Sequence, residues 1–208
     1  MNFNEQIRVL GKGLTAQAIK EKFPNAVLYD DKDFELYDKS SNVKTIVSPG
    51  IPPFNEMILE AKNVQSDYDL FDEVMPFSIW ISGTNGKTTQ MCQHILNEYN
   101  SLCGGNIGTP LSKLSSKAAI WILETSSFTL HYTNIAKPNL YLLLPISEDH
   151  ITWHGSFKEY ENAKLKPLSL MKEGEIAIIP ESYKDYKTDA YKITYKNSDD
   201  LCNKFDID

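Results

Sequence analysis

The sequence has no apolar run approaching the ~18 to 20 residues that a membrane-spanning helix needs, so we exclude a transmembrane protein. The segment from Met1 to Gly11 lacks a basic stretch followed by an apolar stretch, which argues against a secretory signal peptide and predicts a cytoplasmic protein. The three cysteines, Cys92, Cys103 and Cys202, lack CxxC spacing, so neither a disulfide framework nor a structural zinc site is expected.

Basic residues are too few for a nucleic-acid-binding surface. The chain carries 21 Lys and Arg against 28 Asp and Glu, which gives a net charge of -7. Binding to nucleic acid depends on neutralising phosphates with Lys and Arg. We therefore expect no nucleic-acid partner, and any anionic ligand must be held by a local site.

The first part of the chain alternates short apolar runs with helical patterns. The predicted strands are residues 7–10, 26–29 and 45–47, and the predicted helices are residues 14–23 and 54–61. Such alternation indicates a parallel sheet with right-handed crossovers.

A second series follows the acidic stretch of residues 67–73, which we interpret as the approach to a domain boundary near Met75 and Pro76. The predicted strands are residues 79–81, 120–123, 140–144 and 176–179. A helix is predicted over residues 88–99, with an apolar stripe of Met91, Cys92, Ile95, Leu96 and Tyr99. The predicted fold class is α/β, with a Rossmann-like parallel-sheet domain over residues 1–75 and a P-loop-type α/β domain over residues 76–208.

A glycine-rich loop, residues 82–89, lies between a predicted strand and a predicted helix and reads Ser-Gly-Thr-Asn-Gly-Lys-Thr-Thr. Backbone N–H groups in such a loop converge on one point, the helix N-terminus adds positive potential, and Lys87 adds a full charge. This pattern is typical of a loop that holds nucleotide phosphates, with the Thr88 hydroxyl placed for Mg²⁺. The general P-loop pattern has a glycine where Ile81 stands, so the match is incomplete. A glycine-rich turn without a ligand is the alternative.

A second glycine loop, Gly11-Lys12-Gly13-Leu14-Thr15-Ala16, fits the G-x-G-x-x-[G/A] pattern after a strand. Asp30 and Asp31 follow at about the distance expected for an acid that binds ribose. The pattern alone leaves three interpretations open: a structural turn, a dinucleotide site, or a site for another diphosphate compound.

Acidic and imidazole side chains follow two other predicted strands. Glu124 follows residues 120–123, and the run Glu148-Asp149-His150 follows residues 140–144. Since open α/β sheets bind ligands at the carboxyl ends of their strands, Glu124 and His150 are candidate metal ligands. The alternatives are a helix-capping role for Glu124 and a solvated loop position for His150.

The run Ser156-Phe157-Lys158-Glu159 resembles a capping box that opens a helix. On this helix Lys164 shares a stripe with Phe157, Tyr160 and Leu168, so it lies on the face expected to be buried. A buried ammonium is costly unless it is paired, neutralised or modified. Considered alone, this helix favours a lysine whose head group stays in water.

Four motifs in this order resemble the Mur ligases of peptidoglycan synthesis. They are residues 83–89 (Gly-Thr-Asn-Gly-Lys-Thr-Thr), 104–108 (Gly-Gly-Asn-Ile-Gly), 124–128 (Glu-Thr-Ser-Ser-Phe) and 148–150 (Glu-Asp-His). The resemblance covers essentially the whole chain, and it departs from the family where Thr129 replaces a usual Gln and Thr152 a usual Asp.

The resemblance assigns roles to individual residues. It implies that the substrate diphosphate contacts Leu14 and Thr15. The uracil would contact Asp30, Asp31 and Lys32. Other parts of the substrate would contact Ser48, Asn106 and Ser126. It implies an ATP site formed by Gly83, Thr84, Asn85, Gly86, Lys87, Thr88 and Thr89. One Mg²⁺ would be held by Thr88 and Glu124, and a second by His150 together with a CO₂-carbamylated Lys164. The implied catalytic residues are Lys87, His150 and Lys164.

The implied reaction is the ATP-dependent joining of D-glutamate to UDP-N-acetylmuramoyl-L-alanine by a cytoplasmic enzyme, expected to be a monomer. The family's third domain, which carries the amino-acid site, has no motif here, so the chain is expected to be an N-terminal portion that binds substrates without ligating them. The alternatives are another Mur ligase, a folylpolyglutamate- or cyanophycin-type ligase, a non-catalytic nucleotide-binding module and an NAD-dependent oxidoreductase.

Overall fold

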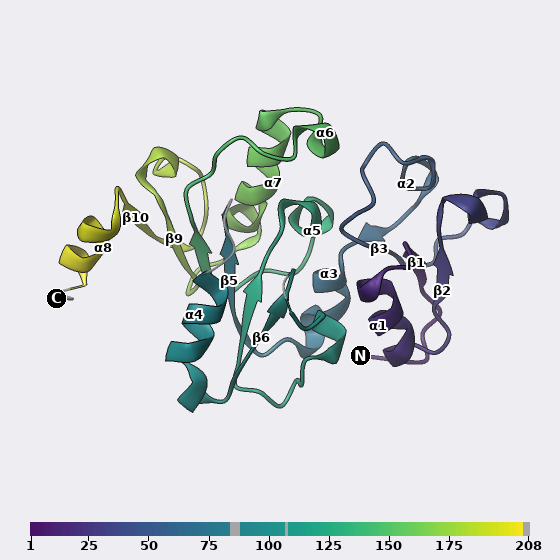
Figure 1. Ribbon diagram of the computed structural model, residues 1–208, viewed down its shortest axis with the longest axis horizontal. Coiled ribbons are helices and arrows are strands. Elements are labelled where there is room, and N and C mark those ends of the chain that lie inside the picture. Colours follow the sequence, from purple (N-terminus) through teal and green to yellow (C-terminus); the bar gives the residue numbers. More distant parts are fainter. Residues whose placement is uncertain (84–87, 107, 206–208) are drawn as a thin grey trace.

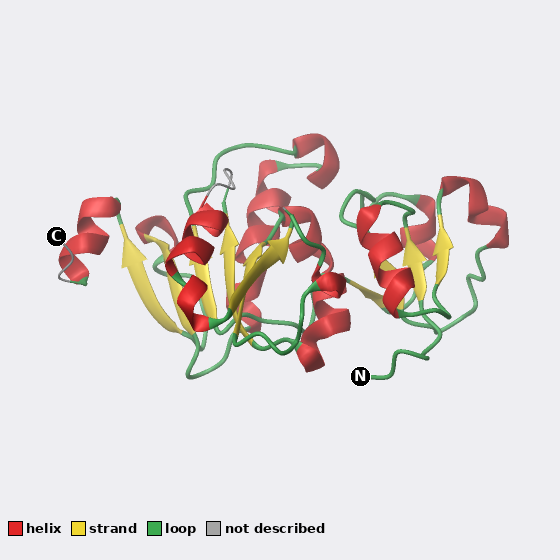
Figure 2. Cartoon of the chain, turned by 60° about the horizontal axis from the view of Figure 1, so that its bottom comes forward, coloured by secondary structure: helices red, strands yellow, loops and turns green. Residues whose placement is uncertain are grey.

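The structure, a computed structural model, describes residues 1–83, 88–106 and 108–205. Its strands form two parallel sheets that lie beside each other in Figures 1 and 2. The α/β class predicted from the alternation of apolar runs and helical patterns is therefore confirmed. Lys87 and its neighbours Thr84, Asn85 and Gly86 lie outside the described residues.

The smaller sheet is built from the first part of the chain. Its strand order is β2-β1-β3-β4, and every pair is parallel. The strands are β1 (Arg8–Leu10), β2 (Val27–Tyr29), β3 (Thr45–Val47) and β4 (Val64–Gln65). Helices α1 (Leu14–Lys22) and α2 (Glu56–Glu60) and the 3₁₀ helix η1 (Asp31–Leu36) connect them.

The larger sheet has the strand order β10-β9-β8-β5-β7-β6, again with every pair parallel. The strands are β5 (Phe77–Ser82), β6 (Ser101–Gly105), β7 (Ile120–Glu124), β8 (Leu140–Leu143), β9 (Ile176–Pro180) and β10 (Tyr191–Tyr195). The central strands contribute Trp80, Ile122 and Leu143, which are fully buried. Because neighbouring strands are parallel, their carboxyl ends meet at one edge of the sheet.

Helices cover both faces of the larger sheet (Figure 2). The helices of this part of the chain are α3 (Asp67–Phe71), α4 (Thr88–Ile95), α5 (Ser127–Tyr132), α6 (Ile151–His154), α7 (Phe157–Leu170) and α8 (Ser198–Lys204), with 3₁₀ helices η2 (Asp72–Val74), η3 (Asn97–Tyr99), η4 (Leu111–Lys113) and η5 (Glu181–Tyr183). Helix α4 packs on β6 and β7, and α5 packs on α7. In the part of the chain that the structure describes, no helix is both long and apolar enough to cross a membrane.

The two sheets share one buried apolar cluster, which contains residues from both of them. The rings of Phe23 and Phe71 lie 6.1 Å apart between α1 and α3. The Lys22 ammonium lies 5.4 Å from the centre of the Phe71 ring and donates a 3.0 Å hydrogen bond to the Ser112 carbonyl. The proposed domain boundary near Met75 and Pro76 falls between β4 and β5 and stays a prediction.

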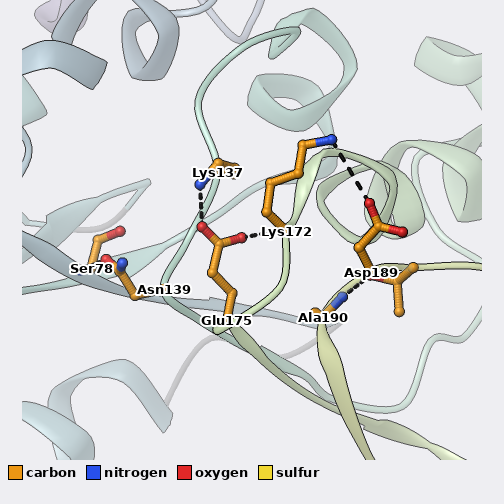
Figure 3. Close-up of polar contacts among 8 residues, drawn as sticks. Ser78, Lys137, Asn139, Lys172, Glu175, Asp189 and Ala190 are labelled. Atoms are coloured by element: carbon orange, nitrogen blue, oxygen red, sulfur yellow. Dashed lines mark hydrogen bonds and ion pairs between the residues drawn. The ribbon is translucent and has the colours of Figure 1, made fainter.

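A buried carboxylate ties together the loops before β8 and β9, at the amino ends of the strands (Figure 3). Glu175, which is 7% exposed, pairs with Lys137 and accepts a 2.6 Å hydrogen bond from the Lys172 backbone N–H. Nearby, the Asn139 side chain accepts a 2.8 Å hydrogen bond from the Ser78 N–H. These contacts fix the edge of the sheet opposite to the carboxyl ends.

All seven predicted strands are present, with ends that differ by up to two residues from the prediction. Three strands were not predicted: β4, β6 and β10. Each lies at an edge of its sheet. Strand β6 includes Gly104 and Gly105, and β10 alternates polar and apolar residues, so neither resembles the continuous apolar run of a central strand.

The apolar stripe predicted for residues 88–99 is partly wrong. Helix α4 ends at Ile95, and Met91, Ile95 and Tyr99 are 67%, 67% and 64% exposed. The inward face instead follows Thr89 and Cys92, since Thr89 is buried and Cys92 is half-buried. The predicted stripe thus combined exposed residues with the inward-facing Cys92.

Candidate functional site

A cavity of about 100 Å³ lies at the carboxyl edge of the larger sheet. Strand β5 reaches it through Ile81, Ser82 and the following Gly83, β7 through Glu124, and β8 through Leu144, which follows its last residue. The other lining residues are Thr89, Asn106, Thr125, Ser126, Ser127, His150, Tyr160 and Lys164. The structure therefore brings seven of the residues predicted from the sequence into one cavity: Gly83, Thr89, Asn106, Glu124, Ser126, His150 and Lys164.

Lys164 extends from α7 into this cavity and is only 2% exposed. Its ammonium donates hydrogen bonds to the Gly83 carbonyl at 2.8 Å and to Ser82 Oγ at 3.2 Å. Burial lowers the pKa of Lys164 to about 8, while the carboxylates of Asp149 and Glu124 act in the opposite direction. The head group is buried with its stem, which excludes the solvated lysine that the helix alone suggested.

Glu124 is the last residue of β7 and is 8% exposed. Its Oε1 accepts a 3.2 Å hydrogen bond from Asn106 Nδ2, whereas its Oε2 is buried without a hydrogen-bond partner among the described residues. Burial raises the pKa of this carboxyl, and the bond from Asn106 opposes that shift. A buried carboxylate oxygen with no donor is suited to a cation.

His150 lies in the loop between β8 and α6, with φ of 51°. A non-glycine residue in the left-handed region carries strain that the surrounding structure must hold in place. The His150 N–H donates to Asp149 Oδ1 at 2.7 Å, and the ring lies 4.7 Å from the Phe128 ring. The imidazole thus lines the cavity, and both the backbone N–H and the ring of His150 have partners.

Two hydroxyl groups that the resemblance assigned to ligands have different surroundings. Thr89 Oγ1 is buried and has no partner among the described residues. Ser126 caps α5, because its Oγ accepts a 3.1 Å hydrogen bond from the Thr129 N–H and pairs with Thr129 Oγ1 at 3.0 Å. Thr88 begins α4 beside the cavity-lining Thr89.

A larger cavity of about 500 Å³ lies between the two sheets. Its lining residues come from five segments: Gly11, Lys12, Gly13, Leu14 and Thr15; Ser48, Pro49, Gly50 and Ile51; Asp67 and Tyr68; Gly105 and Asn106; and Thr129. Leu14, Thr15, Ser48 and Asn106, all predicted to bind substrate, are therefore neighbours around one space. Asn106 lines both cavities, so they adjoin at this residue.

Two glycines make these approaches possible. Gly11 has φ of +106°, and a Cβ there would lie 2.6 Å from Ser48 Oγ. Gly105 has φ of +99°, and a Cβ there would lie 2.4 Å from the Glu124 carbonyl oxygen. Glycine alone adopts such a backbone without cost, so both loops require it at these positions.

The acidic residues after β2 lie apart from both cavities. Asp30 caps η1 by accepting a 3.0 Å hydrogen bond from the Lys32 N–H, and its side chain pairs with Lys12 at 3.2 Å. Asp31 lines a separate space of about 150 Å³ with Phe34, Asn55, Glu56 and Met57. Lys12, in the glycine loop, links this acidic cap to the larger cavity.

Sequence patterns missed three groups that the structure places at these cavities. Asp67 is buried, and its Oδ1 has no partner among the described residues; burial raises its pKa to about 7. Tyr68 donates a 3.1 Å hydrogen bond to the Glu124 carbonyl. Ser127 and His154 contact each other across the aromatic cluster beside the smaller cavity. Ser127 lies in the motif of residues 124–128, but nothing in the sequence pairs it with His154, and no motif spacing marks Asp67 or Tyr68, because these contacts come from packing between distant segments.

The fold and the cavity at the carboxyl ends of its strands define a protein of the Mur ligase family, to which the chain belongs: a model of the Mur ligase middle domain matches residues 81–201. The chain is similar to UDP-N-acetylmuramoylalanine--D-glutamate ligase of Campylobacter jejuni subsp. jejuni serotype O:23/36 (strain 81-176), with 47% identity over 98% of this chain and 56% of the relative. The protein of the same name from Helicobacter pylori (strain ATCC 700392 / 26695) is 44% identical over 86% of this chain and 44% of its own length. The chain thus spans about half the length of these relatives.

Solved structures share the fold at low identity. UDP-N-acetylmuramate:L-alanyl-gamma-D-glutamyl-meso-diaminopimelate ligase from Neisseria meningitides superposes with a TM-score of 0.56 at 10% identity, covering 93% of this chain and 78% of that one. MurF from Acinetobacter baumannii gives a TM-score of 0.50 at 15% identity, covering 92% of this chain and 46% of that one. These likenesses extend over both sheets.

Proposed function

We propose that the protein is an ATP-dependent ligase that joins D-glutamate to UDP-N-acetylmuramoyl-L-alanine, in cytoplasmic peptidoglycan synthesis. The observation that carries this proposal is the pair of adjoining cavities, which share Asn106. One is lined by the residues assigned to ATP and metal, and the other by the residues assigned to the UDP-linked substrate. The names of the Campylobacter and Helicobacter relatives support the choice of substrate and amino acid.

The larger cavity fits the UDP-linked substrate in its donor set. The backbone from Gly11 to Thr15 approaches it at the start of α1, and the buried Ser48 Oγ has no partner among the described residues. A diphosphate prefers backbone N–H groups and hydroxyl donors of this kind. We place the uracil near Asp30, Asp31 and Lys32. The ion pair between Lys12 and Asp30 connects these residues to the glycine loop that lines the larger cavity.

The proposed reaction has two steps. The substrate's terminal carboxylate attacks the γ-phosphorus of ATP, and the bond from that phosphorus to the β–γ bridging oxygen breaks. ADP departs, and the substrate becomes an acyl phosphate. The amine of D-glutamate then attacks the acyl carbon, loses a proton and expels inorganic phosphate. Catalysis of the first step consists of positioning the reactants and neutralising the charge on the phosphoryl oxygens. Because Lys87 stands in the glycine loop, we assign it to neutralise the charge of the phosphoryl group that is transferred.

Mg²⁺ fits the smaller cavity because Glu124 Oε2 is buried there without a hydrogen-bond donor among the described residues. Among the same residues no three His, Cys, Asp or Glu side chains converge. Mg²⁺ is commonly held by one or two carboxylates together with substrate phosphates, so Glu124 with the Thr88 hydroxyl is a sufficient protein contribution. The bound ion would neutralise charge on the phosphoryl oxygens, and we assign a second ion to His150 and a modified Lys164.

Carbamylation of Lys164 fits its surroundings. A pKa of about 8 leaves a substantial neutral fraction of the amine near neutral pH. The neutral nitrogen attacks CO₂ and loses a proton, which replaces a buried ammonium with an anion able to bind a cation. The position of Lys164 in the same cavity as Glu124 and His150 supports this assignment.

Calorimetric titration of the 208-residue chain tests the proposal, because the residues that we assign to the substrate, ATP and Mg²⁺ all lie within it. We expect saturable binding of UDP-N-acetylmuramoyl-L-alanine and of Mg²⁺ with a non-hydrolysable ATP analogue, and no binding of NAD. Lys87→Ala should weaken the ATP analogue by roughly tenfold or more, the value of a charge-assisted hydrogen bond. Binding of NAD in place of both ligands would identify an oxidoreductase instead.

A further inference from the structure

Ser127 Oγ and His154 Nε2 lie 2.9 Å apart, at hydrogen-bond distance, beside the smaller cavity. Ser127 is the first residue of α5 and lines that cavity, and His154 is the last residue of α6. The two residues are 2% and 7% exposed. Neither residue belongs to the phosphate, metal or substrate residues assigned above.

Aromatic rings surround the imidazole of His154. The ring of Phe128 stacks on it at 5.6 Å, and the rings of Trp153 and Tyr160 lie at 4.5 Å and 5.4 Å. Burial lowers the pKa of His154 to about 4, with further lowering by His131, His150 and Lys164. The ring is therefore neutral near pH 7 and carries a single N–H.

The position of that hydrogen follows from the partners of the two ring nitrogens. Nδ1 is buried and has no hydrogen-bond partner among the described residues, whereas Nε2 faces Ser127. A buried N–H without an acceptor is more costly than a buried nitrogen lone pair without a donor. The hydrogen therefore lies on Nε2 and is donated to Ser127 Oγ, which leaves the hydroxyl hydrogen of Ser127 free to point elsewhere.

Other hydroxyls that line the cavity are already engaged. Ser82 donates to the Thr125 carbonyl at 2.8 Å, and Thr125 donates to the Ile81 carbonyl at 3.2 Å. Ser126 is paired with Thr129. Among the described serine and threonine hydroxyls that line the cavity, this leaves Thr89, which belongs to the assigned ATP site, and Ser127.

We propose that Ser127 donates a hydrogen bond to an anionic oxygen of the ligand in this cavity, and that His154 is the positioning residue that directs its hydroxyl. This rests on the proposed function, which supplies two sources of such an oxygen: the phosphoryl group of ATP and the terminal carboxylate of the UDP-linked substrate. Ser127 is a ligand-binding residue in this assignment, and His154 acts only through it.

Affinities of the 208-residue chain for three probes test the ligand contact: inorganic pyrophosphate, Mg²⁺ with a non-hydrolysable ATP analogue, and UDP-N-acetylmuramoyl-L-alanine. Ser127→Ala should weaken binding about tenfold, for the phosphate probes if the anion is phosphoryl and for the UDP-linked probe if it is the carboxylate. Ser112→Ala, which removes another buried hydroxyl that lines neither cavity, is the matched control and should leave all three affinities unchanged.

The positioning role has its own variants. His154→Phe keeps an aromatic ring but has no donor, so it should reproduce the loss seen in Ser127→Ala, and combining the two changes should add nothing further. His154→Gln places an amide N–H near the position of Nε2 and should restore most of the affinity. A merely structural histidine would show no such rescue.

Nitrogen-15 NMR of the histidine rings provides a readout that requires no ligand, with the hydrogen of His154 expected on Nε2. A hydrogen on Nδ1, or equal affinities of wild type and Ser127→Ala for every probe that the wild type binds, would overturn the inference while leaving the proposed function intact. Failure of the wild type to bind any of the probes would overturn both. Thermal unfolding of each variant confirms that the comparison is between folded proteins.

Discussion

Lys164 Nζ donates a 2.8 Å hydrogen bond to the carbonyl oxygen of Gly83, joining the middle of α7 to the residue that follows β5. The same ammonium lies 5.1 Å from the centre of the Tyr160 ring. The amine is thus held at the entrance to the glycine loop by a backbone acceptor and an aromatic face. Burial in this position lowers the pKa of the Lys164 amine to about 8.

The buried amine of Lys164 should form a carbamate when CO₂ is supplied. We expect a carbamate carbon signal in NMR spectra of the chain equilibrated with ¹³C-bicarbonate near pH 8, where the neutral amine is well populated. Lys164→Met should remove this signal. Lys166→Met, a change two residues away in α7 at a lysine that donates to the His131 carbonyl, should retain it. An unchanged signal in Lys164→Met would place the modification elsewhere.

Glu124→Gln should reduce the contribution of Mg²⁺ to nucleotide binding. The amide keeps the shape of the side chain and an oxygen for Asn106, but it removes the negative charge that faces the cavity. With Mg²⁺ present, we expect the affinity for the ATP analogue to fall roughly ten- to a hundredfold, the range of a lost charge-assisted contact. Without Mg²⁺, calorimetry should give nearly equal affinities for the two proteins. Equal losses under both conditions would argue against Glu124 as a metal ligand.

The central strands of both sheets could be predicted from the sequence because burial on both faces produces continuous apolar runs. Edge strands have no such requirement: β6 contains a glycine pair, and β4 has only two residues. Their pairing depends on a neighbouring strand distant in sequence, which local patterns do not encode. The same limit explains the exposed stripe of α4, since a pattern shows periodicity but not which stripe meets the sheet.

The candidate site residues that stand at the ends of strands could be predicted from the sequence. Glu124 and Gly83 stand directly at the ends of strands, and their convergence follows from a parallel sheet. Asp67 and His154 could not be predicted, because one reaches its cavity from α3 and the other contacts Ser127 only through helix packing. The contribution of Asn106 to both cavities likewise depends on how the two sheets meet.

The pair of Lys137 and Glu175 should stabilise the fold without affecting ligand binding, since it lies at the amino ends of the strands (Figure 3). Lys137→Met leaves the buried Glu175 carboxylate without its cation, so we expect the free energy of unfolding to fall by roughly 1–3 kcal/mol in urea titrations. Lys117→Met, at an exposed lysine, is the control. A change in nucleotide affinity would show that the two edges of the sheet are coupled.

His154 should make the protein less stable in acid. Its pKa is about 4 in the folded protein and near 6.5 when unfolded, so below pH 6.5 the unfolded chain binds more protons. The stability contribution of the neutral ring is present above pH 6.5 and is lost as the pH falls toward 4, by roughly 1–3 kcal/mol. Urea titrations at pH 7 and pH 4.5 should show a smaller pH dependence in His154→Phe than in wild type. Equal pH dependence in both proteins would contradict the assignment.

Asp67 should act in the opposite direction, because its pKa is raised from 3.8 to about 7 by burial. Between these two values the folded protein binds more protons than the unfolded chain, so the contribution of the protonated carboxyl to stability is lost as the pH rises toward 7. Asp67→Asn cannot ionise and should become more stable relative to wild type, on the order of 2 kcal/mol, as the pH rises from 4 to 8. Asp185→Asn, at an exposed carboxyl, should show no such trend. Since Asp67 lines the larger cavity, binding of the UDP-linked substrate at pH 8 should also shift the titration of this carboxyl in wild type. Parallel curves of stability against pH for wild type and Asp67→Asn would contradict the prediction, because they would mean that the carboxyl is ionised in the folded protein throughout.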